Sequence, residues 1–266
     1  MHDLKELENE SIYIIRETFK SFSKTAMLWS MGKDSTVMLW LVRKAFHGRV
    51  PFPLFHIDTS YKMPEMIKYR DEKAREWNLD LKIFQNSDAL KSGMGPSQSK
   101  IVCCNSLKTD GLKLGLKEHP CNGLLVAIRR DEEGSRAKER FFSPRDLHFE
   151  WDQENQPPEL WNQYVTEFPE HIHTRVHPIL RWSEINIWEY IKQENIPVLD
   201  LYFSKNGKRY RSVGCAPCTG SIDSEAKNVD EIIEELKRTK TSERAQRAQD
   251  QENHYAMEKL RKKGYM

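Results

Sequence analysis

Residues 25–45 read TAMLWSMGKDSTVMLWLVRKA and pass through three patterns in turn. The short apolar run Ala26–Trp29 is typical of a buried strand, and the polar run Ser30–Ser35 follows it directly. Apolar residues then recur at helical spacing, at Val37, Met38, Leu41, Val42 and Ala45. A loop between a strand and a helix offers unpaired backbone amides at the positive end of the helix dipole. The stretch therefore predicts an anion-binding turn at the end of a buried strand.

The alternation of strand and helix continues on both sides of this stretch. A helix is predicted over Leu4–Phe22, and another begins at Pro64 and ends near Trp77. Further strands are predicted at 54–57, 81–84 and 124–128, with a helix over 110–117. Strands that alternate with helices form βαβ units and a parallel sheet. We therefore expect an α/β fold with a doubly wound, mainly parallel sheet and helices on both faces.

The second half of the chain is less regular. Gly134–Pro169 is polar and lacks periodicity, which is typical of a long binding loop or a disordered segment. Histidines at 171, 173 and 177 alternate, which favours a polar strand at a sheet edge over a metal site. Helices are predicted at 183–194, 229–237 and 242–261. We expect a sheet domain over residues 1–200 and a helical C-terminal extension over 201–266.

Composition excludes several classes of protein. Lys and Arg number 42 against 40 Asp and Glu, so the net charge is only +2 and any nucleic-acid surface must be local. The chain has no run of 18 apolar residues, and its charged start, MHDLKELENESIY, has no apolar signal region. The five cysteines are an odd number and two of them are adjacent, which does not suit a disulfide framework. We expect a protein of the reducing cytoplasm with no membrane partner.

The Ser30–Ser35 loop carries groups that suit a polyphosphate. Gly32 permits close backbone approach, Lys33 supplies a cation, and Ser30 and Ser35 supply hydroxyl donors. Asp34 would repel a phosphate unless Mg²⁺ bridges the two. The pattern is not the GxxxxGK[ST] sequence of P-loop NTPases. On spacing alone, a plain tight turn with a helix cap is an equally good interpretation.

A second charged stretch, the arginine loop Arg129–Arg136, follows the predicted strand at 124–128. It emerges at the same sheet edge as the Ser30–Ser35 loop, because parallel strands end on one side. Guanidinium groups bind phosphate or sulfate oxygens in a bidentate manner, and phosphoryl-type chemistry depends on such positioning. A solvated loop of mixed charge is the alternative.

The Ser30–Ser35 loop resembles the SGGxDS loop of the PP-loop ATP pyrophosphatases. Residues 29–35 resemble, more narrowly, the small subunit of bacterial sulfate adenylyltransferase, in which an apolar residue also replaces the first glycine. Residues 52–59, 129–133, 135–140 and 241–244 extend the similarity over nearly the whole chain. The resemblance implies an adenine nucleotide alpha hydrolase-like fold that binds ATP with Mg²⁺. It also implies attack of an acceptor oxygen on the α-phosphorus and departure of pyrophosphate.

The same resemblance implies roles for individual residues. Those expected to hold the nucleotide are Ser30, Met31, Gly32, Lys33, Asp34, Ser35, Asp58, Arg244 and Arg247. Those expected to take part in catalysis, at the acceptor or the α-phosphate, are Lys33, Asp34, Ser35, Arg129, Arg130, Asp131 and Arg136.

The cysteines form two pairs, Cys103-Cys104 and Cys215-Ala216-Pro217-Cys218. A CxxC turn directs two thiolates to one place and is a common half-site for zinc or an iron–sulfur cluster. Adjacent cysteines suit a larger cluster, in which each sulfur meets a different iron. The combination resembles the cluster site of the assimilatory adenylylsulfate reductases, which implies a [4Fe–4S] cluster on Cys103, Cys104, Cys215 and Cys218. A zinc site and four unrelated buried thiols are the alternatives.

The two resemblances point to a hybrid. The reductases need a catalytic cysteine in the C-terminal tail, and residues 219–266 contain none. Ordinary sulfate adenylyltransferase small subunits lack the cysteine pairs. An adenylylating core with a cluster resembles the ATP pyrophosphatase components of bacterial DNA phosphorothioation systems. That resemblance implies activation of a DNA phosphate for sulfur insertion, with a cysteine desulfurase, other modification proteins and DNA as partners.

Two alternatives remain open. One is a sulfate adenylyltransferase small subunit that forms adenylylsulfate and pairs with a GTPase subunit. The other is an iron–sulfur scaffold with a degenerate ATP site that recruits a cysteine desulfurase. Release of pyrophosphate from ATP would exclude the scaffold.

Overall fold

The computed structural model describes residues 3–161, 163–169, 172–248 and 256–265. Its main sheet has six strands in the order β3-β2-β1-β4-β6-β5. The strands are β1 Thr25–Leu28, β2 Leu54–Ile57, β3 Leu81–Phe84, β4 Gly123–Leu125, β5 Phe142–Arg145 and β6 His173–Val176. All neighbouring strands are parallel except β5, which pairs antiparallel with β6 at one edge. The predicted α/β fold with a doubly wound, mainly parallel sheet is confirmed.

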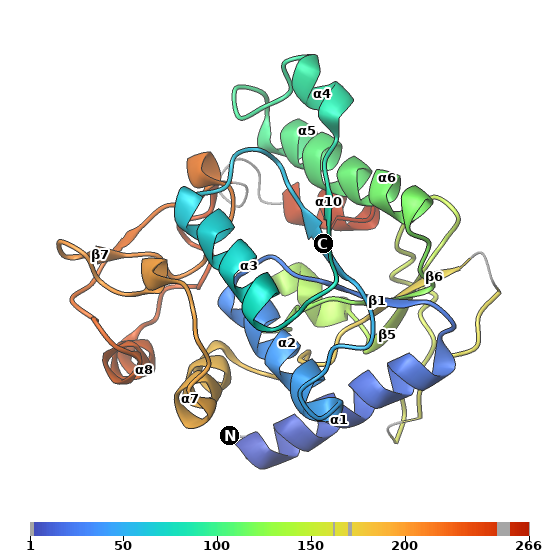
Figure 1. Ribbon diagram of the computed structural model, residues 1–266, viewed down its shortest axis with the longest axis horizontal. Helices are drawn as coiled ribbons and strands as arrows, with labels where there is room; N and C mark the ends of the chain where they lie inside the picture. Colours follow the sequence, from blue (N-terminus) through green and yellow to red (C-terminus); the bar gives the residue numbers. More distant parts are fainter. Residues whose placement is uncertain (1–2, 162, 170–171, 249–255, 266) are drawn as a thin grey trace.

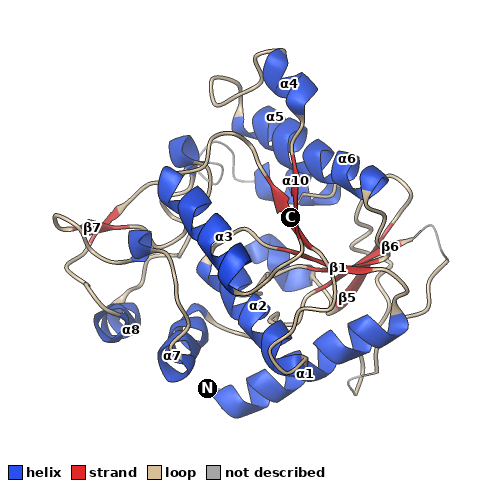
Figure 2. Ribbon diagram, in the orientation of Figure 1, coloured by secondary structure: helices blue, strands red, loops and turns tan. Residues whose placement is uncertain are grey.

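Helices cover both faces of the sheet (Figures 1 and 2). The helices α1 Leu4–Ser21, α2 Lys33–Ala45 and α3 Pro64–Glu76 lie on one side. On the other side lie α5 Lys100–Cys104, α6 Gly111–Glu118 and α10 Ala256–Lys262, with the short α4 Ser87–Lys91 beyond them. The strands β1 and β2 are buried at every position, which is why they are continuous apolar runs in the sequence.

The C-terminal part packs beside this core. The helices α7 Glu184–Glu194 and α8 Val229–Arg238 contact each other, and α7 also contacts α2. Ser183 and Asn186 form a capping box at the start of α7, and Asn228 caps α8. A small ribbon, β7 Lys208–Arg209 and β8 Ile222–Asp223, precedes α8. A domain boundary near residue 200 stays a prediction.

The chain order of the strands creates a switch point between β1 and β4. After β1 the chain adds β2 and β3 on one side, and it then crosses to place β4 on the other. In open sheets of this kind a crevice forms outside the carboxyl ends of the two strands where the order reverses. The Ser30–Ser35 loop leaves β1 at this point, and the arginine loop follows β4.

Three predicted local structures are wrong. The segment predicted as a loop, 134–169, contains a 3₁₀ turn, Gly134–Lys138, and the edge strand β5, because residues 142–145 pair antiparallel with β6. Glu159 accepts the amides of Phe141 and Phe142 at 2.9 and 2.8 Å at the start of this strand. The histidine segment is not at an edge, because β6 lies between β4 and β5 with His173 and His177 buried; His171 lies outside the described residues.

The third difference concerns the predicted helix at 242–261. Residues 243–246 form turns and Arg247 pairs with Thr219, while residues 249–255 lie outside the described part. A described helix resumes only at α10. The side chains of Glu243, Arg244 and Arg247 are buried in contacts with distant residues, which outweigh local helix propensity. No helix among the described residues is long and apolar enough to cross a membrane.

Candidate active site

The Ser30–Ser35 loop is held by its own hydroxyl groups. Ser35 Oγ lies 3.1 Å from Ser30 Oγ and accepts the Ser30 amide at 3.3 Å. It also donates to the carbonyl of Gly32 at 3.0 Å. The helix α2 begins directly after Gly32, and the Lys33 amide donates to the hydroxyl of Tyr202 at 2.8 Å. The loop is thus a fixed turn at a helix N-terminus, as an anion-binding site requires.

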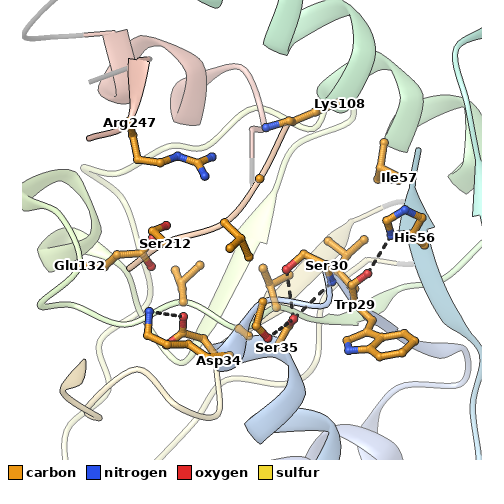
Figure 3. Close-up of a pocket in the computed structure, with 18 of the residues that line it drawn as sticks. Trp29, Ser30, Asp34, Ser35, His56, Ile57, Lys108, Glu132, Ser212 and Arg247 are labelled. Carbon is orange, nitrogen blue, oxygen red and sulfur yellow. Dashed lines mark hydrogen bonds and ion pairs between the residues drawn. The ribbon is translucent and has the colours of Figure 1, made fainter. Parts of the chain in front are cut away.

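A pocket opens above this loop (Figure 3). Its floor includes apolar residues from the ends of three strands: Leu28 from β1, Phe55 and Ile57 from β2, and Val126 and Ile128 after β4. An apolar floor beside a polar loop suits a base joined to phosphates.

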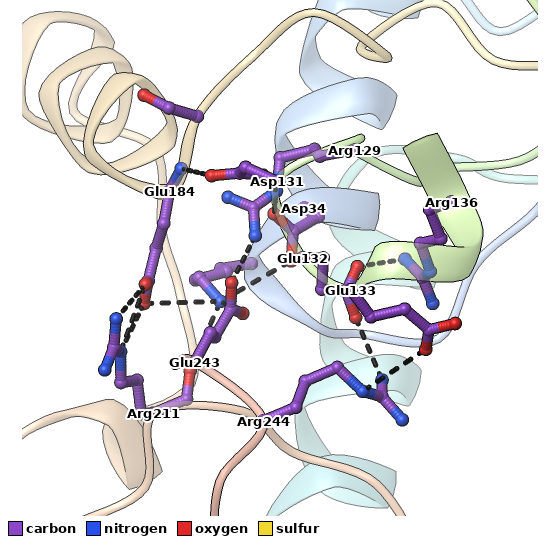
Figure 4. Close-up of polar contacts among 12 residues, drawn as sticks. Asp34, Arg129, Asp131, Glu132, Glu133, Arg136, Glu184, Arg211, Glu243 and Arg244 are labelled. Atoms are coloured by element: carbon purple, nitrogen blue, oxygen red, sulfur yellow. Dashed lines mark hydrogen bonds and ion pairs between the residues drawn. The ribbon is translucent and has the colours of Figure 1, made fainter. Parts of the chain in front are cut away.

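Lys33 does not extend into solvent but enters a buried ion network (Figure 4). Its ammonium pairs with Glu243 and lies 3.5 Å from Asp34. Arg129, which is fully buried, pairs with the same Glu243 and lies 3.0 Å from Asp34. Burial opposes the charge of Lys33, but Asp34, Glu243 and Glu184 outweigh it and raise the pKa of Lys33. The network therefore ties the Ser30–Ser35 loop, the arginine loop and the C-terminal segment together.

The outer part of the network lies at the pocket wall. Glu132 pairs with Arg136 and accepts from Arg244 at 2.9 Å. Burial would raise the pKa of Glu132, but Arg136 and Arg244 hold it well below its ordinary value. Glu132, Arg136 and Arg244 all line the pocket. Two guanidinium groups thus face the space above the Ser30–Ser35 loop.

The structure brings most of the predicted site residues to this pocket. Those that line it are Ser30, Gly32, Lys33, Asp34, Ser35, Arg136, Arg244 and Arg247. Met31 lies within the loop, but its side chain is buried in the core at a positive φ of 62°. Arg129 stands behind the loop in the ion network.

Three residues that the sequence predicts for this site do not line the pocket. Asp58 accepts the amide of Ser60 at 2.8 Å, as a turn cap does. Arg130 donates to the carbonyl of Glu139 at 3.2 Å and stacks over Phe141. Asp131 accepts the amide of Glu184 at 2.8 Å and so caps α7. None of the three is among the residues that line the pocket in the described part of the chain.

The four paired cysteines are buried and lie on segments that meet beside the pocket. Cys103 and Cys104 end α5, and Cys218 closes a turn by donating its amide to the Cys215 carbonyl at 2.9 Å. Burial and the neighbouring thiols of Cys104, Cys215 and Cys218 raise the pKa of Cys103 to about 11, so the two cysteine pairs lie near each other. Within the described residues, no three His, Cys, Asp or Glu side chains converge on a point where one metal ion could bind.

Three cations separate this cysteine site from the Ser30–Ser35 loop. Lys62, Lys108 and Arg247 line the pocket, and Figure 3 shows Lys108 and Arg247 across it from Ser30 and Asp34. The described hydrogen bonds of Lys108 and Arg247 go to the hydroxyl groups of Tyr265 and Thr219, not to carboxylates. Burial and the charges of Lys108 and Arg247 lower the pKa of Lys62 to about 8.

Sequence reasoning missed several residues of this site: Lys62, Lys108, Glu184, Tyr202, Arg211, Glu243 and Tyr265. Glu243 could have been found, because it stands beside Arg244 in a stretch that matches a known family. Lys62 and Lys108 carry no local signal, because each is an isolated lysine in a charged chain. Only the packing of α5 and the segment after β2 against the cysteine turn brings them together.

The chain is similar in sequence to proteins of known family. Residues 24–221 match the phosphoadenosine phosphosulfate reductase domain. Sulfate adenylyltransferase subunit 2 of Marinomonas sp. (strain MWYL1) is 42% identical, with 98% of this chain and 97% of that protein covered. The same subunit of Aeromonas salmonicida (strain A449) is 41% identical over 98% of this chain and 95% of that protein.

Solved structures share the fold at low identity. Candida glabrata FMN adenylyltransferase superposes with a TM-score of 0.56 at 18% identity, covering 80% of this chain and 62% of that one. The phosphoadenylyl-sulfate reductase of Candida auris gives 0.55 at 15% identity, covering 82% and 96%. The chain therefore belongs to the phosphoadenosine phosphosulfate reductase domain family, with sulfate adenylyltransferase subunit 2 proteins as its relatives, and it is an adenylyltransferase that uses ATP.

Proposed function

We propose that this enzyme transfers the AMP moiety of ATP to sulfate, forming adenylylsulfate and releasing pyrophosphate. The observation that carries the proposal is the placement of Lys108 and Arg247 across the pocket from the Ser30–Ser35 loop, with Lys62 also lining that pocket. An anion-binding loop on one side and a cationic wall on the other suit a reaction between a polyphosphate and a second oxyanion.

The cationic wall needs an anion for physical reasons. Buried groups of like charge repel one another, and a buried charge without a partner is costly. Arg247 reaches the pocket only because residue 214 is glycine, since a Cβ there would collide with the guanidinium group. Its Nε is buried without a hydrogen-bond partner in the described part of the chain. A tetrahedral oxyanion would satisfy such donors.

The reaction follows from this placement. One acceptor oxygen attacks the α-phosphorus, the bond to the bridging oxygen breaks, and pyrophosphate leaves toward Ser30, Ser35 and the amides of the loop. Arg136 and Arg244 stabilise charge on the phosphates. Asp34 is the residue that would hold Mg²⁺, which would neutralise the phosphates; its Oδ1 already lies 3.0 Å from Arg129 and its Oδ2 3.5 Å from Lys33, so its carboxylate is placed for a cation at the loop.

Relatives support sulfate as the acceptor, since those reported above are named sulfate adenylyltransferase subunit 2 and are 42% and 41% identical. The word "subunit" in that name also supports a partner chain. We propose that this partner is a GTPase subunit.

The test is release of pyrophosphate from ATP and Mg²⁺ with sulfate, with chloride, or with duplex DNA as the added acceptor. We expect stimulation by sulfate and formation of adenylylsulfate. Lys62→Gln should raise the KM for sulfate at least about tenfold, corresponding to about 1.4 kcal/mol, while Lys68→Gln, an exposed lysine on α3, should not. An equal rate of pyrophosphate release with sulfate and with chloride would refute sulfate as the acceptor.

A DNA phosphate is the second candidate acceptor, and the cysteine site is the observation that favours it. Sulfide delivered by this site would attack the adenylylated phosphorus, the bond from that phosphorus to AMP would break, and a phosphorothioate would remain with AMP as the leaving group. In that case a cysteine desulfurase, other modification proteins and DNA are the partners. Stimulation by DNA rather than sulfate, with phosphorothioate found after nuclease digestion, would select this function.

We also propose that the cysteine site holds a [4Fe–4S] cluster. The four thiols are buried, and Cys103 lies near the other three; a cluster whose irons each bind a different sulfur suits such a set. Burial would raise the pKa of Cys215, but Lys108 and Lys62 lower it to about 7, which favours the thiolate that a metal needs. The cluster would supply either sulfur relay or rigidity.

Anaerobic purification with iron and sulfide analysis tests the cluster. Cys218→Ser should bleach a broad brown absorption, whereas Cys121→Ser should not, because Cys121 lies partly buried against the main core. Bound zinc without iron, or protein without either metal, would contradict the proposal.

A further inference from the structure

The end of the chain folds over the cysteine site. Helix α10 contacts α5, and Met257, Leu260 and Tyr265 form a buried cluster with Cys104 that is separate from the main core. Ile101, one turn before Cys104, packs against the same cluster. Figure 1 shows α10 beside α5, with the C-terminus nearby. The described tail therefore covers one of the four thiol-bearing positions.

Hydrogen bonds and an ion pair hold this tail in place. Arg175, a buried residue of β6, donates to the carbonyls of Gly264 and Tyr265, the latter at 2.8 Å. Arg261 pairs with Glu139 at 2.6 Å. Gly264 has a φ of 89°, and a Cβ there would collide with the carbonyl of Phe149. Such specific anchoring sets the position of the next residue, Tyr265, closely.

Tyr265 is the point where the tail meets the pocket. Lys108 donates to its hydroxyl at 3.0 Å, and the ammonium lies 5.4 Å from the centre of its ring. Both residues line the pocket, and the Lys108 charge also acts on the thiols of Cys104 and Cys215. A lysine stem is flexible, so a fixed acceptor is needed to keep its ammonium in one place.

We propose that Tyr265 is a positioning residue. Its hydroxyl holds the Lys108 ammonium at the boundary between the nucleotide pocket and the cysteine site, while its ring and α10 close the cysteine site to solvent. The first role rests on the proposed oxyanion acceptor, and the second does not depend on it. The acceptor side of the pocket therefore includes a residue that follows α10.

Two variants separate the two roles. Tyr265→Phe removes the hydroxyl and keeps the ring, and a chain that ends at Gly264 removes both. Tyr265→Phe should raise the KM for sulfate about threefold to tenfold with kcat and the KM for ATP unchanged. It should also raise the reactivity of Lys108 toward acetic anhydride, read by mass spectrometry. Tyr13→Phe, on an exposed tyrosine of α1, is the matched control and should change neither quantity.

The closure of the cysteine site to solvent is measured by alkylation of the anaerobically isolated protein with iodoacetamide, followed by peptide mapping. The chain that ends at Gly264 should label Cys104 at least about tenfold faster, while Tyr265→Phe should label it at the normal rate. An unchanged Lys108 reactivity in Tyr265→Phe would overturn the positioning role, and unchanged Cys104 labelling in the shortened chain would overturn closure. Circular dichroism of each variant identifies misfolding. If sulfate proves not to be the acceptor, the two labelling measurements still decide both roles.

Discussion

The ammonium of Lys33 donates a hydrogen bond to the carboxylate of Glu243, which lies 210 positions later in the chain. The second oxygen of the same carboxylate accepts from Arg129 (Figure 4). One side chain from the C-terminal segment therefore joins the first residue of α2 to the arginine loop. The nucleotide site consequently depends on a residue far from the Ser30–Ser35 loop in sequence.

Loss of Glu243 should destabilise the whole site. Glu243→Ala leaves Lys33 and Arg129 buried with one carboxylate fewer, and breaking a buried ion pair costs about 3–5 kcal/mol. We expect the free energy of unfolding to fall by about 3 kcal/mol in urea titrations and the Tm to fall by about 10 °C. Glu234→Ala, on the exposed face of α8, should change stability by less than about 0.5 kcal/mol. Equal stability of the two variants would show that the network contributes nothing.

Turnover should depend on the side chains of the Ser30–Ser35 loop. Ser35→Ala removes the hydroxyl that contacts Ser30 and Gly32, and Asp34→Ala removes the carboxylate expected to hold Mg²⁺. Each should lower pyrophosphate release at least about tenfold, since a lost transition-state contact costs about 1.4 kcal/mol or more. Ser21→Ala, at the exposed end of α1, is the control. Normal turnover in both loop variants would place the active site elsewhere.

At position 31, the glycine variant should be more stable than the alanine variant. The Met31 φ of 62° is strained for any residue with a Cβ, by about 1 kcal/mol, yet the buried Met31 side chain contributes about 2–3 kcal/mol. Met31→Gly and Met31→Ala should therefore both be less stable than the natural protein. Glycine should be the better of the two by about 1 kcal/mol, in contrast to most buried sites. Thermal unfolding decides this, and a more stable alanine variant would mean that the strain is absent.

Acid should weaken the fold through its buried, neutral histidines. Burial lowers the pKa of His56 to about 4 and that of His173 and His177 to about 3. The unfolded chain, with ordinary pKa values near 6.5, binds protons that these buried rings do not, so stability is full above about pH 6.5 and falls as the pH drops toward 4.

The contribution of one ring can be isolated. His177→Asn keeps a donor for the Arg140 carbonyl but cannot titrate. Between pH 7 and 5 it should lose about 2 kcal/mol less stability than the natural protein. His148→Gln, an exposed position, should leave the pH dependence as it is. Parallel pH profiles of the natural protein and His177→Asn would contradict the buried, neutral state of the ring.

Local patterns predict the sheet well where one physical cause dominates. The strands β1 and β2 are buried on both faces, so apolar runs mark them, and Pro64 and Ser183 mark helix starts through fixed φ and capping. Patterns fail where distant contacts decide the backbone. Pairing with β6 makes a strand of 142–145, and burial of Glu243 and Arg247 replaces a helix with turns.

The sequence by itself determined the α/β alternation and the turn at Ser30–Ser35, and it holds four of the cysteines in two short motifs. These features depend on neighbours within a few residues, where spacing sets geometry. Only the tertiary structure decided that Lys62, Lys108, Arg247 and Tyr265 share a pocket with that turn, and that Arg130, Asp131 and Asp58 are not among the described residues that line it. The reason is that direction and proximity of side chains from separate elements arise from packing around the sheet, which no short stretch of sequence encodes.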